Sequence, residues 1–114
     1  MMATSILDAI QRIFQGVVYD ELGCESGPEW PHDSFWMEPV VIPKHEAVDI
    51  MRKYGAAAVG DVLRLRLDEA LYKLQNGLGR PAADYPVWCT RPAVIEASGH
   101  ISVVWWIYAE RDKA

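Results

Sequence analysis

The sequence has few of the residues from which small catalytic and metal sites are usually built. Its 114 residues include two cysteines and three histidines. Cys24 and Cys89 lie far apart with no second pair nearby, which excludes a zinc-ribbon spacing and a dense disulfide framework. Residues 1–5 lack the basic and apolar segments of a signal peptide. Because two free thiols are typical of a reducing compartment, we expect a cytoplasmic protein.

The sequence also lacks long apolar runs and clusters of basic residues. No run of about 18 apolar residues is present, so we expect no membrane contact. The eleven Lys and Arg are scattered, and the formal net charge is −5. Since nucleic acids are bound by clustered positive charge, we expect no nucleic-acid partner. An acidic surface favours solubility or a basic protein partner.

Apolar residues, by contrast, are abundant. They make up 51% of the chain, which is enough for the core of one domain spanning residues 1–114. Five of them are Trp. So many large side chains do not all fit inside so small a domain, and some are expected to line a pocket or an interface.

Helical periodicity indicates three helices. The first is predicted over residues 5–22, and the second from Pro43 to Gly55. The third is predicted to begin at Asp61, after a joint of small residues at 56–60. Residues 63–67 also alternate with period two, as a strand would, but the helical pattern continues to Gln75 and favours a helix.

The remaining apolar segments indicate strands. Residues 35–42 are predicted to be extended, and Pro39 places them at a sheet edge or a bulge. Residues 87–96 and 101–110 flank a turn centred on Ser98 and Gly99. A regular hairpin then pairs Ala93 with Val104, Arg91 with Trp106 and Cys89 with Tyr108. The predicted fold is α+β, with a small antiparallel sheet packed on about three helices in the order α-β-α-α-β-β.

His45 and Asp49 form the strongest candidate metal site. They lie one helical turn apart and would need a third ligand such as His32 or His100. The spacing differs from that of the zinc-protease motif, which has a second His at the fifth position. A solvated first helical turn explains the same residues, so we expect no metal and no cofactor.

Cys89 is the candidate nucleophile. Arg91 lies two residues further along the strand and would favour the thiolate. A cysteine in an apolar strand is more often a small buried hydrophobic residue, and no His is tied to it by a local signature. We therefore assign no catalytic residue.

A long polar segment carries the candidate binding site. Residues 25–36 include Trp30, His32, Asp33 and Trp36. A His beside an Asp can act as an acid–base pair, and two Trp can wall an apolar pocket. The alternative is an ordered loop that its aromatic residues pin to the domain.

The final strand predicts self-association. Val104, Trp106 and Tyr108 are apolar on one face, while the other face is also apolar. Three helices cover one side of a small sheet, so the second side is expected to pair with another copy. We place Arg91 opposite Trp106 in this interface.

A compact acidic domain that is rich in Trp and free of longer motifs is similar in general type to the small orphan proteins of mobile integron gene cassettes. Small immunity proteins and antitoxins are similar in the same way. The resemblance implies no particular site. The sequence thus predicts a homodimeric interaction or ligand-binding module without catalysis, whose partners are itself, a small apolar ligand or a basic protein. The alternative is a small enzyme or small-molecule binder with its site under the 25–36 loop.

Overall fold

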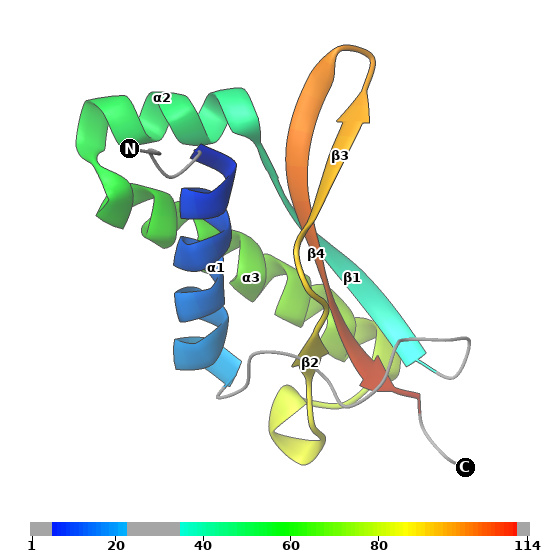
Figure 1. The fold of residues 1–114 in the computed structure, drawn as a ribbon. Coiled ribbons are helices and arrows are strands. Elements are labelled where there is room, and N and C mark those ends of the chain that lie inside the picture. The colour runs from blue at the N-terminus through cyan, green and yellow to red at the C-terminus, as the bar shows by residue number, and fades with distance from the viewer. Residues whose placement is uncertain (1–5, 23–34, 112–114) are drawn as a thin grey trace.

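The fold combines three helices with a four-strand antiparallel sheet, which confirms the predicted α+β class (Figure 1). The computed structural model describes residues 6–22 and 35–111. Its elements are α1 (Ile6–Leu22), β1 (Phe35–Pro43), α2 (Lys44–Tyr54), α3 (Ala56–Leu78), the short 3-10 helix η1 (Ala82–Asp84), β2 (Trp88–Cys89), β3 (Ala93–Ala97) and β4 (His100–Glu110). The order is α-β-α-α-β-β-β, because the predicted strand at 87–96 is divided into two.

Strand β4 is the centre of the sheet. β1 pairs along one side of it, and β2 and β3 pair along the other. β1 is therefore an edge strand, as Pro39 predicted, because a proline has no N–H to donate to a second neighbour. In the β1–β4 register Val40 lies opposite Trp105 and Pro39 lies opposite Trp106.

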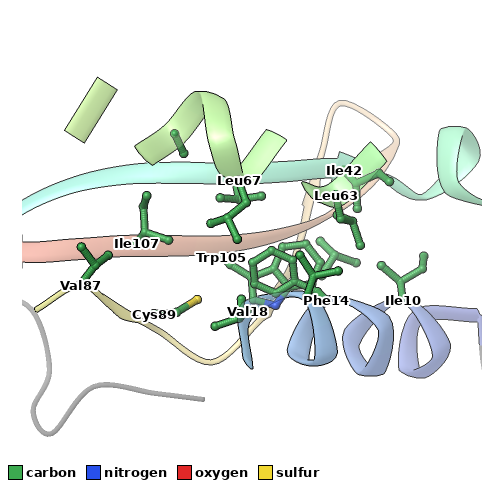
Figure 2. Close-up of a cluster of buried hydrophobic side chains, with 14 of the residues drawn as sticks. Ile10, Phe14, Val18, Ile42, Leu63, Leu67, Val87, Cys89, Trp105 and Ile107 are labelled. Atoms are coloured by element: carbon green, nitrogen blue, oxygen red, sulfur yellow. The ribbon is translucent and has the colours of Figure 1, made fainter. Parts of the chain in front are cut away.

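The helices pack on one face of this sheet, and the core lies between them and β4 (Figures 1 and 2). Trp105 is 1% exposed and stacks on Phe14 of α1, with 3.7 Å between the ring centroids. α3 contributes a stripe of fully buried residues that includes Leu63 and Leu67. The apolar faces of the amphipathic helices α1 and α3 therefore both cover the Trp105 face of β4.

The junction between α2 and α3 differs from the prediction. α3 begins at Ala56, so the small residues at 56–60 are its first turns and not a joint. The chain changes direction between α2 and α3 at the single residue Gly55, which has a φ of 93° that favours glycine. Alanine is the strongest helix former, so the Ala56–Ala58 run continues as helix once the chain has turned. The segment 61–67 is helical, as predicted.

The β3–β4 hairpin has the predicted tip but only part of the predicted register. Ser98 and Gly99 have φ values of 53° and 77°, typical of the tight turn that joins twisted antiparallel strands. Ala93 lies opposite Val104, as predicted. Beyond this point the prediction is wrong, since Cys89 lies opposite Ile107 and not Tyr108.

A β-bulge explains the difference. Thr90 stays in the ladder, because its N–H donates to the Trp106 carbonyl at 2.9 Å and its Oγ1 accepts the Trp106 N–H at 3.1 Å. Arg91 and Pro92 are then left against the single residue Trp105. The extra residue moves Cys89 to the helix-covered face, where it is 1% exposed.

Candidate functional site

The face of the sheet opposite the helices is mainly apolar. β4 presents Val104, Trp106 and Tyr108 on this face, alternating with the core residues Val103, Trp105 and Ile107. By register, β1, β2 and β3 add Met37, Pro39, Val41, Trp88 and Ala93 beside these three, while Thr90 lies opposite Trp106 at the end of β2. The predicted two-sided apolar character of the final strand is therefore present in the sheet.

One end of this face is closed by its own aromatic residues. Phe35 makes edge-to-face contacts with Tyr108 at 5.3 Å and with Trp88 at 6.2 Å between ring centroids. Phe35 is 6% exposed and Tyr108 is 2% exposed. Tyr108, which the sequence placed in an interface, is thus already buried within the chain.

The other end of the face is open. Trp106 is 37% exposed and Ile95 is 45% exposed. Trp106 and Ile95 form a continuous surface with neighbouring residues of β1, β3 and β4, namely Pro39, Val41, Ala93 and the buried Val104. We call this surface the open patch. Trp106 is the outward member of the Trp105–Trp106 pair, as predicted.

Arg91 does not lie opposite Trp106, which is a correction to the predicted interface. The bulge places Thr90 in that position. Arg91 instead lines a hollow on the helix side of the sheet, together with Phe14, Val18 and other residues of α1. The open patch therefore has no arginine at its centre.

Of the four residues proposed for binding in the 25–36 segment, Trp30, His32 and Asp33 lie outside the described residues. Trp36 belongs to β1 and is half-buried. Its indole N–H donates to Glu38 at 2.8 Å, and its ring lies against Gly77 of α3. The Arg111 guanidinium lies over the same ring, 5.3 Å from a centroid. These contacts attach β1 to α3.

The metal candidates are partly brought together. His45 at the start of α2 and His100 at the start of β4 have ring centroids 6.2 Å apart. Asp49 lines the same surface hollow and forms an ion pair with Lys53 at 3.7 Å. Within residues 6–22 and 35–111, no group of three His, Cys, Asp or Glu is arranged to hold a metal ion.

Cys89 has the surroundings of a structural residue. Its thiol is buried, and its Sγ lies 3.3 Å from the carbonyl oxygen of Thr90. Burial on the helix side separates it from the open patch.

Arg80 and Tyr85 attach the segment after α3 to the sheet. Arg80 donates to the Glu110 carbonyl at 3.0 Å, and its guanidinium lies 4.8 Å from the centre of the Tyr85 ring. Burial raises the pKa of the Tyr85 phenol, the nearby Arg80 charge lowers it, and Asp84 raises it further. The net direction is upward, so the phenol stays neutral at physiological pH.

The fold and the open patch together define a small α+β protein with one apolar sheet surface. No family model matches the chain, and no curated protein or solved structure is significantly similar to it. None of the helices in the described ranges is both long enough and apolar enough to cross a bilayer.

Proposed function

We propose that the protein is a self-associating interaction module in which two copies pack through the open patch. One observation carries the proposal. β4 is apolar on both faces, while the three helices pack on only one of them. In an antiparallel sheet whose second face is exposed to water, apolar and polar residues normally alternate along each strand. The apolar residues on both faces of β4 therefore fit a sheet whose second face is covered.

The exposed part of Trp106 makes the gain from pairing substantial. A Trp side chain offers roughly 250 Å² of surface, so an exposed fraction of 37% corresponds to roughly 90 Å². At about 25 cal/mol per Å², covering this area contributes about 2 kcal/mol per copy and about 4 kcal/mol per symmetric dimer. The neighbouring patch residues add to this gain, which opposes the entropy lost on association.

A second copy suits the patch better than a charged partner does. The patch residues themselves carry no charge, although the chain has a net charge of −5. A basic partner would be attracted to the acidic remainder of the surface and not to this area. In a two-fold dimer the same uncharged residues meet from both copies, so no charge is buried.

The test is sedimentation equilibrium of the wild type and of Trp106→Glu at micromolar concentrations. Trp106→Glu removes the contact and would bury a carboxylate, so dimer affinity should fall by about a thousandfold or more. Tyr72→Glu is the matched control, because it places the same charge on an aromatic residue of α3 that is 67% exposed. It should remain dimeric.

Two results would refute this proposal. A wild type that stays monomeric throughout the concentration series has no dimer to explain. A folded Trp106→Glu that dimerises as tightly as Tyr72→Glu would place the interface elsewhere. Circular dichroism of both variants distinguishes lost association from lost folding.

The alternative of a small enzyme receives less support. It relied on His32, Asp33 or Cys89. Cys89 is the only one of these among the described residues, and its buried thiol is directed to a backbone carbonyl. Nucleophilic thiols usually need exposure to solvent, and Cys89 is 1% exposed.

A further inference from the structure

A second site lies on the helix side of the sheet, where the β-bulge leaves a hollow of about 400 Å³ between α1 and residues 89–92. Phe14, Val18 and Trp105 supply an apolar wall, and Gln11, Gln15 and Arg91 supply polar groups. Its size falls within the range of about 300–1,000 Å³ that is usual for small-molecule sites. The bulge is the physical cause, because Arg91 and Pro92 are not held against β4 by a regular ladder.

Trp105 carries an unsatisfied group beside this hollow. Its indole Nε1 is buried and has no hydrogen-bond partner within residues 6–22 and 35–111. Figure 2 shows this nitrogen on the α1 side of the ring, and Phe14 and Val18 of α1 both line the hollow. The stacking of Phe14 on the indole restrains the ring from turning to find an acceptor elsewhere. A buried N–H without a partner is rare and costly, so an acceptor supplied by a ligand would be stabilised here.

The charge of the lining favours an anion. Among the described residues that line the hollow, Arg91 is the only charged one, and it is exposed at the rim. Thr90 also lines the hollow, and its hydroxyl oxygen accepts the Trp106 N–H. A guanidinium and neutral N–H or O–H donors are groups that bind carboxylates. The apolar wall is suited to an aromatic or aliphatic body.

We infer that this hollow binds a small monocarboxylic acid with an apolar body, the carboxylate facing Arg91 and the Trp105 indole. The site is separate from the open patch, since it lies on the opposite face of the sheet. Binding would stabilise the packing of α1 on the bulge, because both elements contribute to the lining.

The experiment follows the five Trp indole N–H resonances by ¹⁵N NMR, with the Trp105 signal assigned through its NOE to Phe14. Phenylacetate is the probe, phenylacetamide is its neutral analogue, and acetate lacks the apolar body. Phenylacetate at millimolar concentrations should shift the Trp105 signal in a saturable way. Phenylacetamide and acetate should each bind at least about fivefold more weakly, as expected when one exposed ion pair or the apolar contact is lost.

Arg91→Ala should weaken phenylacetate binding by about fivefold, while Arg52→Ala on α2 removes the same charge elsewhere and should leave it unchanged. Both arginines are exposed, so neither variant is expected to unfold the protein. A Trp105 signal that does not respond to phenylacetate would overturn the site. Equal binding of phenylacetate and phenylacetamide, or equal effects of the two arginine variants, would overturn its assignment to a carboxylate. Sedimentation of Arg91→Ala should match the wild type, which separates this site from the proposed dimer.

Discussion

Gly77 of α3 offers a sharp test of how β1 is attached to the helices. A Cβ built at this position would lie 2.3 Å from Cε2 and 2.7 Å from Nε1 of Trp36. Such distances cannot be accommodated, so Gly77→Ala must displace the indole. The displacement would break the hydrogen bond from Trp36 to Glu38 and the contact of Arg111 with the ring.

The magnitude follows from opposing contributions. Losing the hydrogen bond costs about 1 kcal/mol. Losing the cation–π contact and part of the indole burial costs about 1–2 kcal/mol more. Replacing a helical glycine by alanine contributes about 1 kcal/mol in the other direction. We therefore expect Gly77→Ala to lower the free energy of unfolding by about 1–2 kcal/mol.

Gly16 of α1 is the matched control. It is also helical, but nothing lies within 4 Å of a Cβ built there. Gly16→Ala should therefore raise stability by about 0.5–1 kcal/mol through helix propensity alone. Urea denaturation at one fixed protein concentration measures both variants, and the sign of the change distinguishes them.

A double mutant isolates the cause. In a Trp36→Leu background the obstacle is reduced, so Gly77→Ala should become neutral or stabilising, with a coupling energy of about 1.5 kcal/mol or more. If Gly77→Ala stabilises the wild-type protein as much as Gly16→Ala does, the packing of Trp36 on α3 is wrong.

Two further predictions concern charged groups. Arg66 is half-buried and donates to the Val41 carbonyl at 2.7 Å and to Glu46, so Arg66→Leu should cost about 2–3 kcal/mol in urea denaturation. Arg64 pairs with Asp20 at the surface, so Arg64→Leu should cost less than about 1 kcal/mol. Equal losses of stability in the two variants would contradict this difference between the half-buried and the surface arginine. Zn²⁺ or a chelator should leave the melting temperature unchanged. A zinc-dependent rise that disappears in His45→Ala would show that a metal site exists.

The helices and the hairpin tip could be predicted because their signals are local. The apolar spacing of α1 and α3 follows the helical period, and Ser98-Gly99 supplies the positive φ values that its turn requires. The start of α3 was misjudged, because small residues next to Gly55 were interpreted as a joint although alanine favours helix.

The site was predictable only in part. The sequence showed that β4 is apolar on both faces, and Trp106 was correctly chosen as the outward Trp. It did not show that Phe35 and Trp88 would pack on Tyr108 and bury it. Those contacts join residues from three strands, and no local pattern encodes which of them meet.

By itself, then, the sequence determined the helix periods, the turn at Ser98-Gly99 and the two-sided apolar character of β4. The tertiary structure alone decided the bulge at Arg91 and Pro92. A regular ladder would have placed Cys89 opposite Tyr108, but the paired hydrogen bonds of Thr90 with Trp106 shift the register by one residue. Because side chains alternate along a strand, that single residue reverses which of them face the helices. It buries Cys89, removes Arg91 from the predicted interface and opens the hollow beside Trp105.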